Sequence, residues 1–222
     1  MANLHKFYAQ RSLQIFNIFS SVFGNNSPRL KFVISYQAVS QWVADQILTY
    51  PGLLSVANVV ASAPYYDCNN IGNSTNTAYL ATQTPAAVIQ QCSANSSFAV
   101  LNAVLAIGSN VSHTYNNISM ATYEAGTSIS ETDTIYTGSE NPAATTNFIA
   151  ANESPSMYGI YKKLLYDYKA NGLDINAPLM IFSGIGLPSK YGSWGLLDYS
   201  DQIYETPTHP KFQAVIDFNK GL

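Results

Sequence analysis

Residues 118–124, ISMATYE, form a short apolar run that ends in a carboxylate. Such a run, bounded by polar residues, predicts a strand that is buried on both faces. Comparable runs occur at 30–37 (LKFVISYQ), 54–63 (LSVANVVASA) and 178–183 (PLMIFS). Strands that are apolar throughout, rather than alternating with polar residues, are typical of a parallel sheet covered on both sides.

Helical patterns separate these runs. Apolar side chains recur at helical spacing over residues 4–23, 39–50, 85–107 and 154–170. Thr208-His209-Pro210 then begins a last amphipathic helix, whose expected buried residues are Phe212, Val215, Ile216 and Phe218. The predicted order is therefore α-β-α-β-α-β-α-β-α.

The loops that follow the strands are long and polar, and the loops that precede them are short. The long loops span residues 64–84, 125–153 and 184–207. This asymmetry is typical of a (β/α)8 barrel with its site at the carboxyl ends of the strands. An open doubly wound sheet is the alternative, but no glycine-rich dinucleotide fingerprint follows any of the strands.

We therefore expect residues 1–222 to form a single α/β domain of four βα units, which is half of a (β/α)8 barrel. Half of the strands cannot close a barrel, and the edge strands would remain unpaired. Another protein chain or a missing N-terminal half is expected to complete it.

The composition narrows the class of partner. Charged residues make up 10% of the chain, with only 10 Lys and Arg and a net charge of −3, so a nucleic-acid partner is not expected. No apolar run reaches the ~20 residues that a membrane span requires. The 16 tyrosines suit contact with sugar or protein, or a tyrosine-rich core.

The cysteines and sequons indicate an extracellular protein. A disulfide between Cys68 and Cys92 would join a long loop to the helix that follows and would need an oxidising compartment; two free buried thiols are the alternative. Residues 1–6 contain no signal peptide, so the chain is either cytosolic or a piece of a longer protein, and we favour the second. Sequons, which are expected in or beside loops except for the one at residue 95, occur at Asn25, Asn73, Asn95, Asn110, Asn117 and Asn152.

Glu124 is the one acid that directly ends a predicted strand, and we expect it to be partly buried. Tyr65 or Tyr66, at the end of the neighbouring strand, is expected to donate a hydrogen bond that keeps it ionised. The alternative is a structural carboxylate that caps backbone amides of residues 125–130. No cofactor or metal is expected, since no metal-ligand spacing relates His5, His113 and His209.

Several short segments resemble a group of microbial secreted proteins related to clan A glycoside hydrolases. They are Phe7-Tyr8-Ala9-Gln10-Arg11-Ser12, Phe23-Gly24, Ala63-Pro64-Tyr65, Ala121-Thr122-Tyr123-Glu124-Ala125-Gly126 and Tyr191-Gly192-Ser193-Trp194-Gly195-Leu196-Leu197. The resemblance implies that the chain is the C-terminal half of a (β/α)8 barrel that cleaves glycosidic bonds with retention, using two glutamates. It implies Glu124 as the nucleophile that ends strand seven, Tyr65 as its hydrogen-bond partner and Trp194 as the floor of a sugar subsite. Further candidate substrate-binding residues at strand ends are Gln37, Tyr66 and Tyr123.

The acid/base, an Asn-Glu pair after strand four in that clan, has no match in this chain. Retaining hydrolysis needs a second carboxyl about 5 Å from the nucleophile. The first hypothesis is therefore a carbohydrate-active hydrolase half completed by an upstream half. The second is a non-catalytic structural glycoprotein, a subunit of a self-assembling extracellular filament or coat. A cytosolic α/β domain in which these features serve only packing is a third.

Overall fold

The computed structural model describes residues 2–25, 27–68, 82, 84–129, 142–173, 178–204 and 209–221. They divide into two compact units. The first comprises residues 1–64, 103–123 and 169–180, and the second comprises residues 65–102, 124–168 and 181–222. Helix α5 (Asn95–Thr114) contributes its first part to the second unit and its remainder to the first.

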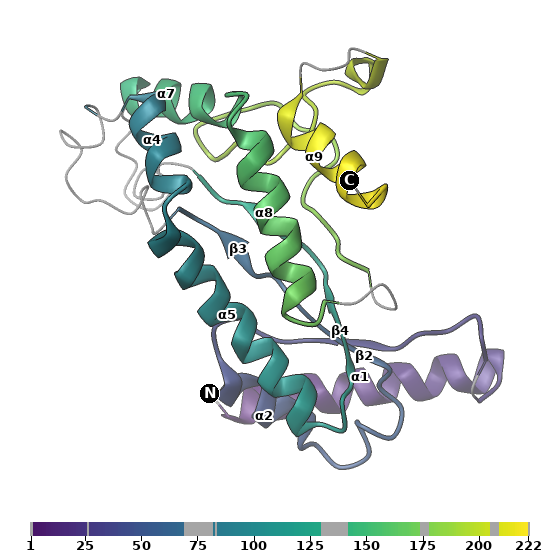
Figure 1. Ribbon diagram of the computed structural model, residues 1–222. Coiled ribbons are helices and arrows are strands. Elements are labelled where there is room, and N and C mark those ends of the chain that lie inside the picture. Colours follow the sequence, from purple (N-terminus) through teal and green to yellow (C-terminus); the bar gives the residue numbers. More distant parts are fainter. Residues whose placement is uncertain are drawn as a thin grey trace. The chain divides into compact units, whose positions relative to one another are not determined.

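The first unit contains a parallel sheet in the order β1-β2-β4 (Figure 1). Its strands are β1 (Val33–Ser35), β2 (Val59–Ser62) and β4 (Ser119–Thr122), and its helices include α1 (Ala2–Phe23) and α2 (Gln41–Leu48). Leu179 forms a parallel bridge with Thr122 on the far side of β4, so the 178–183 segment continues the same order.

The sheet of the first unit is covered on both faces, as its apolar strands require. All four residues of β2 are buried, and Val59, Ala61 and Ala121 pack in one cluster. Gly108 of α5 makes room for Met120 of β4, because a Cβ at this position would collide with the Met120 side chain. These observations confirm the predicted α/β fold with parallel strands. That residues 1–222 form one domain stays a prediction.

The second unit contains a second pair of parallel strands, β3 (Tyr65–Tyr66) and β5 (Gly126–Thr127). Beyond β5, the Phe182 amide donates to the Ala125 carbonyl at 2.8 Å. Ile185 and Leu197 then form a parallel bridge one segment further on. The helices of this unit are α4 (Pro85–Cys92), α7 (Pro142–Asn152), α8 (Met157–Ala170) and α9 (Pro210–Asn219), with a 3-10 turn η2 (Ser200–Tyr204).

Local chemistry sets the helix starts in this unit. The Thr84 side chain accepts from the Ala87 amide at 3.2 Å, and Pro85 occupies the first helical position, where its missing N–H costs nothing. Helix α8 buries the stripe Tyr161, Leu164, Leu165 and Tyr168, as its helical spacing predicts.

Some elements differ from the prediction. Helix α5 runs to Thr114 instead of about residue 107, and residues 142–152, predicted as loop because of their polar composition, form α7. In α9 the fully buried residues are Lys211 and Ala214, whereas Phe212, Val215, Ile216 and Phe218 are only half-buried. The face of α9 that packs inward is therefore not its most apolar one.

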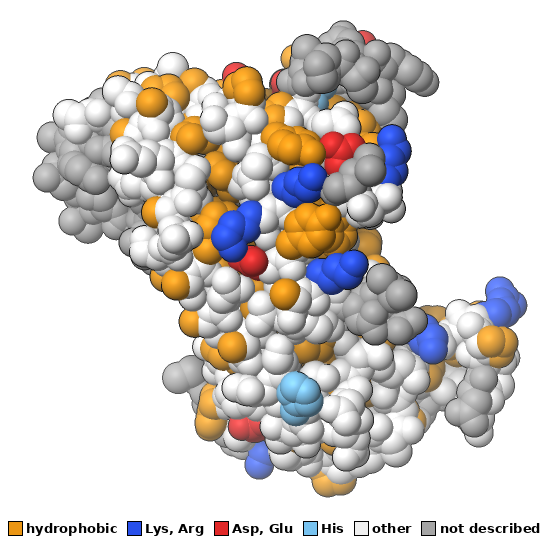
Figure 2. Space-filling model, in the orientation of Figure 1, with side chains coloured by type: hydrophobic (Ala, Val, Ile, Leu, Met, Phe, Trp, Pro, Cys, Tyr) orange, Lys and Arg blue, Asp and Glu red, His pale blue; other side chains and the backbone are white. Residues whose placement is uncertain are grey.

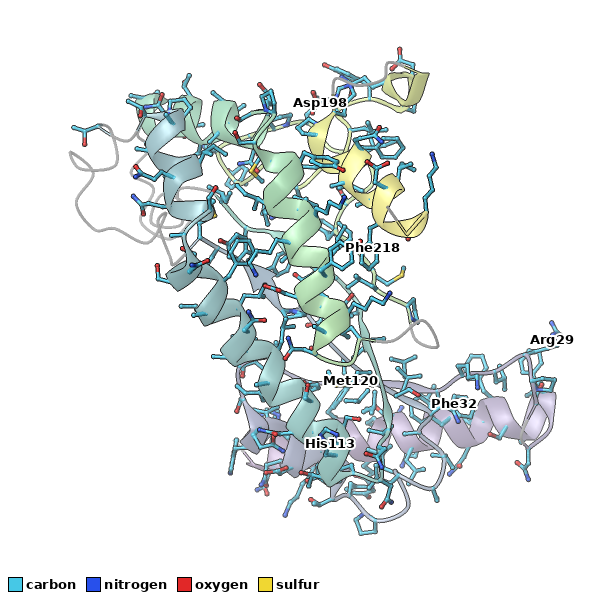
Figure 3. All side chains as sticks on the ribbon, in the orientation of Figure 1. Arg29, Phe32, His113, Met120, Asp198 and Phe218 are labelled. Carbon is cyan, nitrogen blue, oxygen red and sulfur yellow. A yellow bond between two sulfur atoms is a disulfide. The ribbon has the colours of Figure 1, made fainter. Side chains whose placement is uncertain are left out.

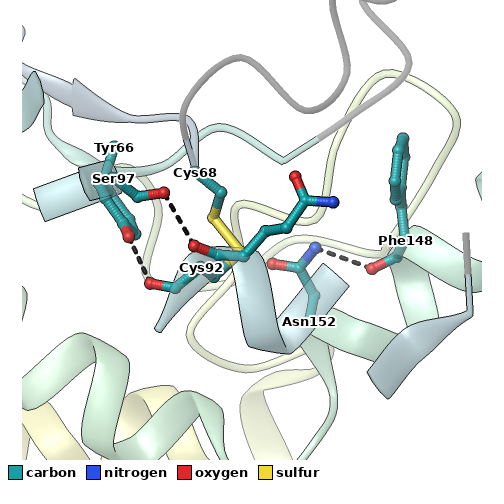
Figure 4. The surroundings of a disulfide bond; sticks show 7 residues. Tyr66, Cys68, Cys92, Ser97, Phe148 and Asn152 are labelled. Carbon is teal, nitrogen blue, oxygen red and sulfur yellow. Dashed lines mark hydrogen bonds between the residues drawn. A yellow bond between two sulfur atoms is a disulfide. The ribbon is translucent and has the colours of Figure 1, made fainter. Parts of the chain in front are cut away.

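The disulfide is confirmed: Cys68 and Cys92 are bonded, with their Cα atoms 4.4 Å apart. The link joins Cys68, the second residue after β3, to the last turn of α4 (Figure 4). Two hydrogen bonds hold the same turn, from the Tyr66 hydroxyl to the Cys92 carbonyl and from the Ser97 hydroxyl to the Gln91 carbonyl at 2.8 Å.

The surface matches the low charge of the sequence. On the face drawn in Figure 2, uncharged polar and apolar side chains outnumber Lys, Arg, Asp and Glu. No single described helix is long and apolar enough to cross a membrane. Helices α4 and α5 are long and apolar enough only when they are taken together, and they are bent by 49° at the break between them.

Replacing both cysteines by serine should lower the free energy of unfolding by about 3 kcal/mol, because the cross-link closes a loop between positions 24 residues apart. Denaturant unfolding at neutral pH measures this. Dithiothreitol should destabilise the native chain by a similar amount and leave the double variant unchanged. Equal unfolding midpoints for the native chain and the variant would contradict the prediction.

Candidate functional site

Glu124 lies between two paired stretches of strand. In β2 and β4, Ser62 pairs with Thr122; in β3 and β5, Tyr65 pairs with Gly126. The two pairs belong to separate sheets, one in each unit. Tyr123, Glu124 and Ala125 connect β4 to β5, so Glu124 lies outside both ladders, at the break between them.

Pro64 contributes to this break because proline has no N–H to donate to a ladder. Glu124, freed from the ladder, is half-buried, as predicted from its position. Within the part of the chain that the structure describes, its side chain makes no hydrogen bond or ion pair. The predicted bond from Tyr65 or Tyr66 is therefore not formed, and neither is the alternative cap on the amides of residues 125–129.

An aromatic pair lies on the segment next to Glu124. The Phe182 amide is bonded to the carbonyl of Ala125, the residue after Glu124. The rings of Phe182 and Trp194 meet edge to face, with centroids 5.9 Å apart, and both are partly exposed. Glu124, Tyr65 and this pair thus lie on neighbouring parallel segments of the second unit.

The backbone around Trp194 requires glycine. Gly192 has a φ of +149°, and a Cβ there would lie 2.7 Å from the indole ring. At Gly195 a Cβ would collide with the Gly186 carbonyl. The close approach of ring and backbone therefore requires glycine at positions 192 and 195.

The other predicted substrate-binding residues are not in this cluster. Gln37 is exposed and Tyr123 half-exposed, and both belong to the first unit. The prediction for Tyr66 is wrong: its side chain is 1% exposed, stacks on Phe98 and donates to the Cys92 carbonyl. Burial also raises the pKa of its hydroxyl. Tyr66 is a core residue of the disulfide turn.

The asparagines of the six sequons differ in their exposure to solvent. Asn25, Asn95, Asn110 and Asn117 are exposed, although Asn110 lies within α5 and not in a loop as predicted. Asn73 lies outside the described residues. Asn152 is contradicted as a glycan site, because it is 2% exposed and its Nδ2 donates to the Phe148 carbonyl at 3.0 Å (Figure 4).

A polar cavity of about 310 Å³, here called the Lys211 cavity, lies beside the first turn of α9. Asp198, which lines it, is labelled in Figure 3. The lining residues come from the end of α7, the segment around Trp194 and the start of α9. They are Asn152, Glu153, Gly186, Pro188, Ser193, Gly195, Leu196, Asp198, His209, Pro210 and Lys211.

Lys211 is 7% exposed and donates from Nζ to the Ser193 carbonyl at 2.6 Å. The Tyr161 ring lies 6.0 Å from the same nitrogen. Burial lowers the pKa of Lys211 to about 8, against the opposing effect of Asp198 and then Glu153. The sequence analysis missed this residue because the apolar pattern of α9 assigned the buried face to its aromatic and aliphatic positions.

Comparison of the chain with protein-family models, curated proteins and solved structures finds no match to any of them. Among the described residues, no group of three or more His, Cys, Asp or Glu side chains is arranged to hold a metal ion. The assignment of a function therefore depends on the geometry described above.

Tyr66→Phe should destabilise the fold by about 1–2 kcal/mol, because it leaves the Cys92 carbonyl without its buried donor. Tyr199→Phe, at a position 54% exposed, is the matched control and should change stability little. Chemical denaturation of both variants and of the native chain measures the change in the free energy of unfolding. A Tyr66→Phe variant as stable as the native chain would show that this hydroxyl has no structural role.

Lys211→Met should alter the pH dependence of stability. The pKa of Lys211 is about 8 in the folded chain and 10.5 ordinarily. Between these two pH values the unfolded chain keeps the Lys211 proton and the folded chain loses it. The contribution of Lys211 to the free energy of unfolding therefore rises with pH. The variant should lose this rise, which is on the order of 2 kcal/mol between pH 8 and about 9.5. Denaturation of the native chain and the variant at the same pH values up to 9.5 measures it, because the ionisation of tyrosines contributes equally to both and cancels in the difference. Lys163→Met should keep the native profile. If the free energy of unfolding of Lys211→Met rises with pH as much as that of the native chain, the rise comes from another group.

Proposed function

We propose that this chain is the C-terminal half of a (β/α)8-type carbohydrate-active protein. It binds carbohydrate beside Glu124, and another protein chain or an N-terminal half completes the barrel. The observation that carries this proposal is the grouping of Glu124, Tyr65 and the Phe182–Trp194 pair on neighbouring parallel segments. In parallel α/β barrels the site is built from strand ends in this way.

The aromatic pair supports a sugar ligand. A partly exposed indole offers a flat apolar surface to the C–H face of a sugar ring, and its edge is fixed by Phe182. The glycines at 192 and 195 allow the backbone to pass close to this ring and to the Gly186 carbonyl, where a Cβ would not fit.

Glu124 is suited to the nucleophile position. A half-buried carboxylate without an ion pair among the described residues is available to attack an anomeric carbon. The attack forms a glycosyl–enzyme bond while a second carboxyl protonates the departing oxygen; water then hydrolyses the intermediate. In this proposal the second carboxyl comes from the completing half, and the chain by itself binds sugar without cleaving it.

A structural glycoprotein of an extracellular filament or coat is the second candidate. The specific observation in its favour is helix α1, which exposes many large apolar side chains: Leu4, Phe7, Tyr8, Ile15, Ile18, Phe19, Val22 and Phe23. Large exposed apolar surfaces are typical of protein–protein contact. The disulfide and the exposed sequons support an extracellular setting for either candidate.

Trp194→Ala should weaken binding to a polysaccharide at least tenfold, roughly 1.4 kcal/mol, because it removes the stacking surface. Binding to starch, β-glucan, mannan and chitin fragments is measured by affinity electrophoresis and calorimetry, with Tyr199→Ala as a control at an exposed tyrosine. Glu124→Gln should keep binding and abolish any turnover by the completed protein. The proposal fails if no polysaccharide binds, or if the native chain and Trp194→Ala bind polysaccharide with the same affinity.

A further inference from the structure

The Lys211 cavity contains a buried acceptor that the fold leaves unused. Asn152 is 2% exposed, and its Nδ2 is occupied by the Phe148 carbonyl. Its Oδ1, among the described residues, has no hydrogen-bond partner. A buried polar atom of this kind is rarely left unsatisfied, and an ordered water or a bound hydroxyl group can supply its donor.

The cavity also contains a buried cation and two acids. Lys211 uses one of its three N–H bonds on the Ser193 carbonyl. Asp198 and Glu153 act on Lys211 electrostatically, yet neither lies within ion-pair distance of it in the described structure. Donor and acceptor groups therefore line one space of about 310 Å³, which is at the small end for ligand pockets.

The charges select the class of ligand. Two carboxylates disfavour an anion, and the ammonium of Lys211 disfavours a cation. An apolar ligand would leave the Asn152 acceptor unsatisfied. A hydroxyl group both donates and accepts, so several hydroxyls on one ring can satisfy Asn152, Asp198 and Lys211 together.

We propose that the Lys211 cavity binds a small neutral polyhydroxylated ligand, such as a cyclic polyol or a single sugar ring. Trp194 does not line this cavity, whereas its neighbours Ser193 and Gly195 do. The site is therefore separate from the aromatic surface next to Glu124, and the inference does not depend on the proposed function.

The test uses the intact chain labelled with ¹⁵N and titrated with myo-inositol and glucose. Acetate and ethylamine serve as anionic and cationic probes, and cyclohexanol serves as a largely apolar ring with a single hydroxyl. We expect both polyols to bind, with amide shifts concentrated at Ser193, Gly195 and Asn152, and the other probes to bind more weakly. Lys211→Met should weaken polyol binding about tenfold, and Lys163→Met, at a side chain 43% exposed on α8, should leave it unchanged.

The shift map on the native chain decides the question even if Lys211→Met does not fold. Absence of polyol binding, shifts located elsewhere, or stronger binding of acetate, ethylamine or cyclohexanol would overturn the proposal. The proposal would also be overturned if polyol binding were lost in Trp194→Ala but kept in Lys211→Met, because the ligand would then bind at the aromatic surface. Binding that survives Trp194→Ala and depends on Lys211 supports this inference whatever the outcome for polysaccharides.

Discussion

Parallel backbone pairing between residues 59–66 and 119–127 determines the positions of the other features. The first part of this pairing, β2 with β4, forms the centre of the sheet in the first unit, and the second part, β3 with β5, begins the strands of the second. Parallel ladders need both faces covered, and the apolar residues of β2 meet that requirement. The two parts are separate sheets, and Glu124 lies on the connection from β4 to β5, outside both ladders.

Much of this arrangement could be predicted from the sequence. The apolar runs marked the strands and their parallel direction, and the cysteine spacing indicated the disulfide. The strands themselves are only two to four residues long, and an apolar run does not show where the backbone pairing begins and ends within it. The partial burial of Glu124 and its nearness to the Trp194 segment were also within reach of strand-end reasoning.

Other features depend on contacts between distant parts of the chain. Tyr65 and Tyr66 are identical in type, and only the packing of Phe98 and the Cys92 turn makes Tyr66 the buried member of the pair. A lysine in an amphipathic helix normally lies on the solvent face. Lys211 lies inward because its Nζ donates a hydrogen bond to the Ser193 carbonyl and acidic groups offset part of its desolvation. Asn152 is similar: a sequon in the primary structure becomes an interior residue once α7 forms.

The connection between Cys68 and Cys92 has a consequence for the integrity of the polypeptide. Residues 69–91 lie within a covalently closed ring, so a protease that cuts once anywhere between the two cysteines leaves both fragments attached to each other. Such a nicked molecule keeps β3 and α5 on one connected chain and migrates as a single species until the sulfur bridge is reduced. In an extracellular setting rich in proteases, this long segment can therefore be cleaved without releasing either part of the protein.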